Sequence, residues 1–211
     1  MSSLESASKL QTDLKKINID AELFEGTYGS EAEDLVKAEN RKVHHINFKG
    51  NQIDPRGIAK ASRPGVIGCF YSHYRLWKKC IELNETVCIF EDDVKIIRPL
   101  HMIEFNEVLV IALGAVKKRK YIHYLENPTG DPNAMDYYHA SMPGAVGYLI
   151  KPNAAKKLIN YYKDTYLSAD NAINQAVVEI QIHNYLIGEA NLDKQSLTKA
   201  SNFWRAFNNQ S

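Results

Sequence analysis

The sequence is poor in cysteine, has no long hydrophobic run and carries almost no net charge. The three cysteines, Cys69, Cys80 and Cys88, show no CxxC spacing, and an odd number of thiols without a secretory context indicates a reducing compartment. The first ten residues, MSSLESASKL, lack the basic start and apolar stretch of a signal peptide, so we expect a cytoplasmic protein. The longest apolar run, 108–116, is far shorter than the ~20 residues that span a bilayer. We therefore expect no integral membrane association, although peripheral contact stays open.

Charge and length narrow the class of protein further. The net charge is +1, from 26 Lys and Arg against 25 Asp and Glu, so the overall balance calls for neither nucleic acid nor a membrane as partner. A local charged patch is still compatible with that balance. The chain has 211 residues, 45% of them hydrophobic, which is enough for one sizeable core and too little for two. We therefore expect a single domain over 1–211.

The hydrophobic pattern predicts helices and strands that alternate along the chain. Helices are expected at 8–17, 31–40, 67–83, 103–116, 153–162 and 170–179. Strands are expected at 21–24, 86–90, 121–125, 145–150 and 182–187, with loops at 52–64 and 127–133 and a loop-like tail from 193. This alternation predicts an α/β sandwich with a mainly parallel sheet, helices on both faces and mixed pairing near the end.

Three adjacent acids, Glu91, Asp92 and Asp93, follow a predicted buried strand. Like charges so close together raise one another's pKa unless a cation lies among them, and Mg²⁺ and Mn²⁺ prefer oxygen ligands. Ligands of open α/β sheets bind beyond the carboxyl ends of the strands, where this cluster lies. Side chains alternate along an extended chain, so Glu91 and Asp93 are the expected metal ligands while Asp92 braces the loop. The alternative is a solvated strand end whose acids pair with Lys95 or Arg98.

The helix predicted just before that strand carries His73 on its apolar stripe, with Ser72 beside it. On such a stripe a histidine is most often a core residue with one satisfied ring nitrogen. The alternative is that His73 or Ser72 lies at a helix end and faces a ligand. Gly65 and Gly68 permit close approach of the backbone to a ligand or a neighbouring element, and a phosphate could lie at the amino end of this helix.

These two segments together form a recognisable pattern. It consists of Gly68-Cys69, Ser72-His73 and Trp77, followed about a dozen residues later by a strand and Glu91-Asp92-Asp93. The pattern resembles glycosyltransferase family 25, the family of lipopolysaccharide and collagen galactosyltransferases. Further similarity lies at 14–29, 147–152, 155–158, Asp170 and 197–203, so the resemblance covers nearly the whole chain.

Two departures from the family pattern are visible. Family members usually begin with a strand of the VYVINL kind that helps hold the nucleotide, whereas this chain begins within the helix that follows it. Either that strand is lost, or another segment replaces it, or the sequence begins after it. Val66 also occupies a place where the family often has glutamate.

The resemblance implies a GT-A-type, Rossmann-like fold and a nucleotide-diphosphate sugar donor such as UDP-galactose. It also implies Mn²⁺ or Mg²⁺ held by the acidic cluster and transfer with inversion. An inverting enzyme needs a general base for the acceptor hydroxyl, and Asp170 is the candidate, with His73 as a second catalytic candidate. Asp170 can equally be the N-cap of the helix predicted after it. The expected residues of donor or acceptor binding are Gly68, Ser72, Asp92 and Gly147.

Several readings of the function stay open. The first is a metal-assisted transferase that acts on a hydroxyl of a glycan such as lipopolysaccharide. Its variant is a phage-type enzyme that glycosylates hydroxymethylated DNA bases, and the third is a non-catalytic relative that binds a sugar or a partner. The loop at 131–136, with His139 and Ser141, could cover the donor or be a solvated connection. The basic run 117–120 could meet an anionic acceptor or complement a helix dipole.

Overall fold

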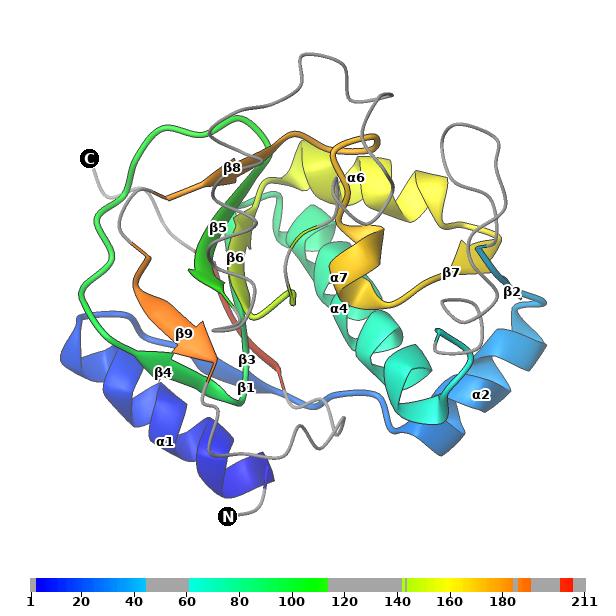
Figure 1. The fold of residues 1–211 in the computed structure, drawn as a ribbon, viewed down its shortest axis with the longest axis horizontal. Coiled ribbons are helices and arrows are strands. Elements are labelled where there is room, and N and C mark those ends of the chain that lie inside the picture. Colours follow the sequence, from blue (N-terminus) through cyan, green and yellow to red (C-terminus); the bar gives the residue numbers. More distant parts are fainter. Residues whose placement is uncertain are drawn as a thin grey trace.

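The computed structural model describes residues 3–44, 61–113, 142, 144–183 and 186–190, and the backbone of 202–206. Helices and strands alternate through much of this part of the chain (Figure 1). In chain order the elements are α1 (Ser3–Lys16), β1 (Glu22–Phe24), α2 (Gly29–Ala38), β2 (Lys42–Val43), α4 (Pro64–Leu83), β3 (Val87–Glu91), β4 (Val94–Ile96), β5 (Val108–Leu113), β6 (Gly147–Ile150), α6 (Pro152–Tyr161), β7 (Thr165–Tyr166), α7 (Ala169–Ala172), β8 (Ile180–Ile182), β9 (Gly188–Ala190) and β10 (Asn202–Ala206). The α/β class is therefore confirmed, and the arrangement is consistent with a Rossmann-like glycosyltransferase fold.

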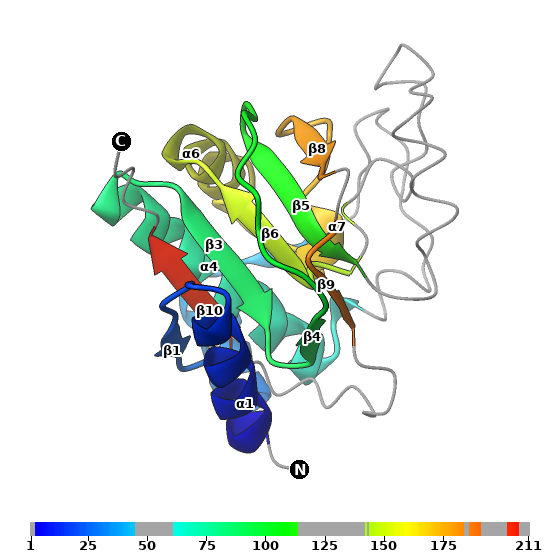
Figure 2. The same cartoon turned by 90° about the vertical axis from the view of Figure 1, so that its left-hand side faces the viewer.

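One mixed sheet forms the centre of the molecule (Figure 2). Its strand order is β1-β10-β3-β6-β5-β9-β4, with β8 beside β5, while β2 and β7 form a separate pair. Among the described pairs of the main sheet, only β5 with β8 and β5 with β9 are parallel. The prediction of a mainly parallel sheet was therefore wrong. The alternation of helices and strands along the sequence does not determine the direction of each strand in the sheet. Here β6 lies antiparallel between β3 and β5, and β10 lies antiparallel between β1 and β3.

Helices cover both faces of this sheet, as predicted (Figures 1 and 2). Alternate residues of β3 serve the two faces, as the period of two in an extended strand requires. Val87 and Ile89 belong to the hydrophobic cluster that also contains α4 and α6 residues. Cys88 and Phe90 belong to the cluster on the opposite face, which contains α1. The next residue on the α4 side of β3 is Glu91, so this alternation directs its side chain toward α4.

The segment 103–116 is the clearest error of the sequence-based assignment. It was predicted as a helix, but Val108–Leu113 is the strand β5, and every residue in it is buried. Periodicity cannot show whether a short apolar run is a buried helix or a central strand, because neither element has a polar face. The β-branched residues of β5 lie between β6 and the strands β8 and β9, where both faces are covered.

The carboxyl-terminal third also differs from expectation. The helix predicted at 170–179 is limited to Ala169–Ala172. The strand predicted at 182–187 overlaps β8 only at Ile182, and its residues 184–185 lie outside the described residues. The tail predicted as loop contains β10, which pairs antiparallel with both β1 and β3. The segment that forms β10 is short and has polar neighbours in the sequence. It forms a strand because it pairs with β1 and β3, and a local sequence pattern does not reveal such pairing. The predicted strand at 121–125 and loop at 127–133, and residues 52–60 of the loop predicted at 52–64, lie outside the described residues.

The remaining helix and strand predictions near the site are confirmed. The helices predicted at 8–17, 31–40, 67–83 and 153–162 correspond to α1, α2, α4 and α6. Pro64 and Pro152 occupy first-turn positions of α4 and α6, where a missing N–H costs nothing. No helix in the described part of the chain has the length and apolar character needed to cross a bilayer.

Candidate functional site

The acidic cluster begins at the last residue of β3. Glu91 ends the strand, and its backbone N–H donates to the carbonyl oxygen of Val146 at 2.9 Å. Asp92 and Asp93 form a turn that leads directly into β4. The alternation expected for three extended residues therefore stops at Glu91, because the chain turns after it. All three acids are partly buried.

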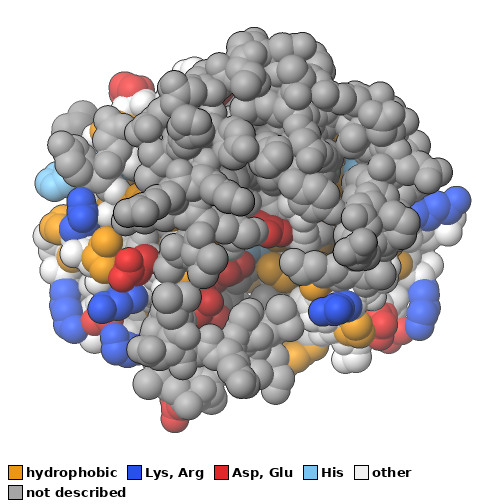
Figure 3. All heavy atoms as spheres, in the orientation of Figure 1, with side chains coloured by type: hydrophobic (Ala, Val, Ile, Leu, Met, Phe, Trp, Pro, Cys, Tyr) orange, Lys and Arg blue, Asp and Glu red, His pale blue; other side chains and the backbone are white. Residues whose placement is uncertain are grey.

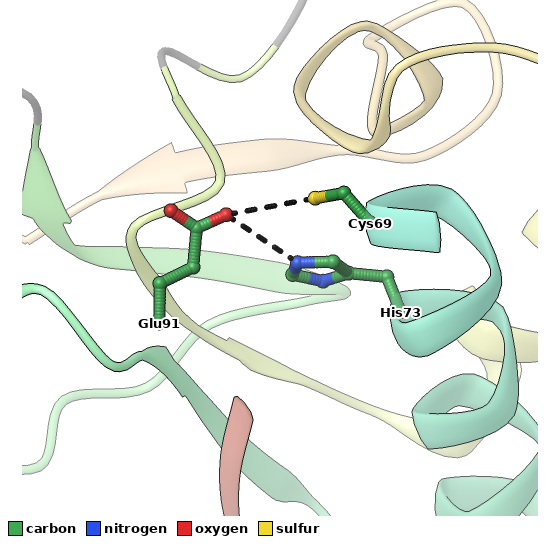
Figure 4. Close-up of side chains that lie close together, drawn as sticks. All are labelled: Cys69, His73 and Glu91. Carbon is green, nitrogen blue, oxygen red and sulfur yellow. Dashed lines mark hydrogen bonds and ion pairs between the residues drawn. The ribbon is translucent and has the colours of Figure 1, made fainter. Parts of the chain in front are cut away.

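Glu91 faces two side chains of α4 (Figure 4). Its Oε1 atom lies 3.9 Å from the Sγ atom of Cys69 and 3.6 Å from the Nε2 atom of His73. Cys69 and His73 are four residues apart on a helix, so they lie on one face of it. The three candidate ligand atoms all lie within 4.8 Å of one another. Figure 4 shows the second carboxylate oxygen of Glu91 pointing away from both α4 residues.

His73 is fully buried and forms part of a polar chain inside the core. Its Nδ1 atom lies 2.7 Å from the hydroxyl of Tyr148 on β6. That hydroxyl also accepts a hydrogen bond from the indole N–H of Trp77 at 3.0 Å. Burial lowers the pKa of His73 to about 3, so its ring is neutral near pH 7.

The carboxylates near Glu91 are its neighbours Asp92 and Asp93 and one from a distant part of the sequence, Asp170. Burial raises the pKa of Glu91 well above its usual value, and the charges of Asp93, Asp170 and Asp92 raise it further, in that order. Burial also raises the pKa of the Cys69 thiol, with the charges of Glu91 and Asp170 next in size. The fold thus brings Asp170 into electrostatic contact with the cluster after β3. On the face drawn in Figure 3, acidic side chains gather near the centre, beside hydrophobic ones.

Asp170 lies inside the short helix α7 and does not cap it. The N-cap is Ser168, so the N-cap alternative for Asp170 was wrong by two positions. The Oδ1 atom of Asp170 accepts the backbone N–H of Asn171 at 3.0 Å. Asp170 is partly buried, and α7 packs against α4. The charge of Asp170 also reaches the Cys69 thiol on that helix, where it helps to raise the pKa of the thiol.

Gly68 and Ser72 hold the segment before α2 against α4. The hydroxyl of Ser72 accepts the backbone N–H of Thr27 at 2.9 Å and donates to the carbonyl oxygen of Gly68 at 2.8 Å. A Cβ atom on Gly68 would lie 2.6 Å from the carbonyl oxygen of Thr27. The side chain of Arg75 adds a bond to the Thr27 hydroxyl at 3.2 Å. Both predicted residues therefore position a backbone segment, and a direct ligand contact by either stays a prediction.

The contacts of Gly147 are with packing residues. It pairs with Phe90 in β3 and with Ala112 in β5, and a Cβ atom there would lie within 3 Å of both side chains. Phe90 and Ala112 belong to the cluster on the α1 face, opposite to His73. Donor or acceptor binding by Gly147 stays a prediction, while its packing role is visible.

Some functional candidates were missed by the sequence reasoning. Cys69 was named only as a reduced thiol and within the family pattern, and its spacing of four from His73 was a usable signal for a shared site. Tyr148 gave no signal, because its contact with His73 depends on the pairing of β3 with β6. The loop at 131–136, the basic run 117–120, His139 and Ser141 lie outside the described residues.

The group around Glu91 can hold a cation by two different donor sets. The carboxylates of Glu91 and Asp93 offer the hard oxygen ligands that Mg²⁺ and Mn²⁺ prefer. The charge of Asp93 is the largest electrostatic contribution to the raised pKa of Glu91 after burial, and a cation between the two groups would reverse that cost. The other set, Cys69, His73 and Glu91, mixes sulfur, nitrogen and oxygen.

Comparison with known proteins identifies the family. The family model for Glycosyltransferase family 25 (LPS biosynthesis protein) matches residues 1–173. The chain belongs to glycosyltransferase family 25. The family 25 match includes the pattern around Gly68 and His73 on α4, the three acids after β3, and Asp170.

Characterised relatives are longer than this chain. Lipooligosaccharide biosynthesis protein lex-1 of Haemophilus influenzae is 28% identical over 144 residues, which are 60% of this chain and 47% of that protein. Procollagen galactosyltransferases 1-B and 1-A of Xenopus laevis are 27% and 29% identical over 164 residues, 72% of this chain and 25% of each relative. The chain therefore spans about half the length of the first relative and a quarter of the other two.

Proposed function

We propose that this family 25 chain is a glycosyltransferase that moves a sugar from a nucleotide-diphosphate donor, of the UDP-hexose kind, to a hydroxyl of a glycan acceptor. The observation that carries the proposal is that Asp170, from a distant part of the chain, lies close enough to Glu91 at the carboxyl end of β3 for its charge, like that of Asp93, to raise the pKa of Glu91. A site of this kind supplies carboxylates both for a cation and for a general base. The name of one relative, which concerns lipooligosaccharide biosynthesis, supports a glycan acceptor, whereas the procollagen galactosyltransferases by name act on a protein.

Glu91 and Asp93 are the proposed ligands of Mn²⁺ or Mg²⁺. The bound ion would neutralise the charge that develops on the leaving diphosphate. Burial favours this arrangement, because a carboxylate shielded from water interacts more strongly with a cation than an exposed one. Asp92, in the same turn, is proposed to orient the donor and to keep the turn closed.

Asp170 is the proposed general base. Its Oδ1 atom is engaged by the N–H of Asn171, so Oδ2 is the atom proposed to accept the proton of the acceptor hydroxyl. Attack of that hydroxyl on the anomeric carbon, with departure of the nucleoside diphosphate on the opposite side, inverts the configuration in one displacement. The neutral imidazole of His73 is buried behind Glu91 and is proposed to act through that residue.

The location we propose is the cytoplasm, where nucleotide sugars would be available to the site. The three cysteines, Cys69, Cys80 and Cys88, form no disulfide with one another, which is compatible with a reducing compartment. Contact with a membrane would then be peripheral.

The roles of the two carboxylate groups can be separated by mutation. Asp170→Asn should abolish transfer and lower Mn²⁺ affinity only modestly, because the amide cannot take the proton and removes one nearby negative charge but leaves the ligands in place. Asp93→Ala should remove both transfer and Mn²⁺ affinity while the circular dichroism spectrum stays that of the wild type. A matched control is Asp34→Ala, which removes a carboxylate that is 82% exposed and should change neither property.

The acceptor is tested with the same wild-type protein. Transfer from UDP-sugars is measured to a lipooligosaccharide core and to hydroxymethylated DNA in parallel. Labelled glycan supports the proposal, and label in DNA alone would replace the acceptor class. Nucleotide binding without transfer to either would favour the non-catalytic alternative.

A further inference from the structure

A continuous row of buried polar atoms runs from the middle of α4 to Glu91. It begins at the indole nitrogen of Trp77, passes through the hydroxyl of Tyr148 and the ring of His73, and ends at Oε1 of Glu91. The side chains of Trp77, Tyr148 and His73 are all fully buried. Such a row has a direction, because each contact in it needs one hydrogen-bond donor and one acceptor.

The direction follows from the chemistry of the first two members. An indole nitrogen can only donate, so Tyr148 accepts from Trp77. The single hydroxyl proton of Tyr148 then has His73 Nδ1, 2.7 Å away, as its acceptor. With the reverse assignment, that proton would be buried without an acceptor, at a cost of about 1–3 kcal/mol. Burial raises the pKa of Tyr148, which keeps this proton in place.

The remaining proton of the neutral imidazole therefore resides on Nε2 and faces Glu91. Cys69 also turns its thiol toward the same Oε1 atom, at 3.9 Å. Cys69 and His73 of α4 thus both direct a polar group at one carboxylate oxygen, while the other oxygen points away from them (Figure 4). The 3.6 Å between Nε2 and Oε1 is longer than a hydrogen bond, and Nε2 is buried with no hydrogen-bond partner among the described residues, so Glu91 is its nearest acceptor.

We propose that Trp77 and Tyr148 are positioning residues, which hold the Nε2–H of His73 toward Glu91 and so fix the orientation in which Glu91 presents its outer oxygen to a divalent cation. The cation half of this inference rests on the proposed function. The tautomer half rests only on the geometry of the buried row.

The main competitor is a thiol-containing metal site formed by Cys69, His73 and Glu91. Their spacing suits an ion such as Zn²⁺, which takes sulfur, nitrogen and oxygen ligands. That site needs a lone pair on Nε2, and hence a proton on Nδ1. Trp77 and Tyr148 disfavour this tautomer. The Tyr148 hydroxyl would then accept hydrogen bonds from both the indole N–H and the Nδ1–H, and its own hydroxyl proton would have no acceptor.

The tautomer can be read directly from the wild-type protein. Nitrogen-15 nuclear magnetic resonance of histidine-labelled full-length chain should place the His73 proton on Nε2, with Nδ1 unprotonated and hydrogen-bonded. A proton on Nδ1 overturns the inference. A thiolate-to-metal absorption band with added Co²⁺ that disappears in Cys69→Ser would also overturn it, because Sγ and Nε2 would then be ligands.

The positioning role is tested with Tyr148→Phe, which keeps the ring and removes the hydroxyl. The matched control is Tyr71→Phe, which removes another mostly buried hydroxyl whose bond is to Glu39 at 2.9 Å. Tyr148→Phe should release the fixed tautomer and weaken Mn²⁺ binding roughly tenfold, as is typical when a group behind a metal ligand is lost. Transfer should then need more Mn²⁺ for half-maximal rate, while kcat at saturating Mn²⁺ stays close to that of the wild type.

The outcomes separate this inference from the proposed function. Equal Mn²⁺ affinity in Tyr148→Phe and wild type, or an equal loss in Tyr71→Phe, overturns the positioning role. A wild-type protein that binds no Mn²⁺ overturns the proposed function and the cation half, while the resonance experiment still decides which tautomer the row fixes.

Discussion

Replacing Gly68 with alanine tests the close approach of α4 to the segment before α2. The added Cβ would lie 2.6 Å from the carbonyl oxygen of Thr27 and 3.3 Å from the backbone nitrogen of Gly29. Both contacts are with backbone, so no side-chain rotation relieves them. The nearby bond from the Thr27 N–H to Ser72 would lengthen as the two segments separate.

The size of the effect follows from opposing contributions. Alanine in a helix interior is favoured over glycine by about 1 kcal/mol. Overpacking costs about 1–3 kcal/mol, and weakening a buried hydrogen bond adds about 1–3 kcal/mol. The net destabilisation expected for Gly68→Ala is therefore about 3 kcal/mol. For a domain of this size, that lowers Tm by about 6–12 °C.

Denaturant unfolding of wild type, Gly68→Ala, Ser72→Ala and the double variant measures the coupling. Since both single changes disturb the same Thr27 contact, their costs should add to more than the cost of the double variant. A Gly68→Ala protein that is about 1 kcal/mol more stable than wild type would refute the close approach, because only helix propensity would then be acting.

Two further predictions concern packing and pH. Gly147→Ala should destabilise the fold by about 1–3 kcal/mol in urea unfolding, because its Cβ would lie 2.8 Å from the Cβ of Ala112, and unchanged stability would contradict that contact. Burial raises the pKa of Glu39, but hydrogen bonds from Arg41 and Tyr71 outweigh it, so the pKa is lowered overall. A carboxyl pKa lowered by folding stabilises the protein above the unfolded-state value near 4.5, and this contribution is lost as the pH falls below it. Wild type should therefore lose more stability than Glu39→Gln between about pH 5 and pH 3. The difference should be less than about 1 kcal/mol, because the Glu39 carboxylate is over a third exposed. Identical stability profiles of the two proteins over this pH range would contradict the assignment.

Local features of the sequence predicted the elements that carry the site. The apolar stripe of α4 with its amino-terminal proline, and the β-branched run before Glu91, are short-range patterns that the fold preserves. The acidic cluster could be located for the same reason, since it directly follows that strand. Its internal geometry could not, because a turn at Asp92 and Asp93 replaces the extended backbone that alternation assumes.

Long-range pairing explains what the sequence did not reveal. The hydroxyl of Tyr148 reaches His73 only because β6 lies beside β3, in a register that no local pattern contains. The strand β5 was mistaken for a helix because its burial on both faces removes the alternation that marks a strand. The strand β10 pairs with β1 and β3, which lie more than a hundred residues before it in the sequence, and no local pattern contains that pairing.

The central claim is that Glu91 and Asp93 hold a cation that binds the donor nucleotide. Calorimetry of UDP binding to the full chain, with and without Mn²⁺, tests it most directly. The account predicts binding that needs Mn²⁺ in the wild type, no such binding in Asp93→Ala, and wild-type behaviour in Asp34→Ala. The absence of metal-dependent binding of any nucleotide by the wild type, or unchanged binding by Asp93→Ala, would contradict it.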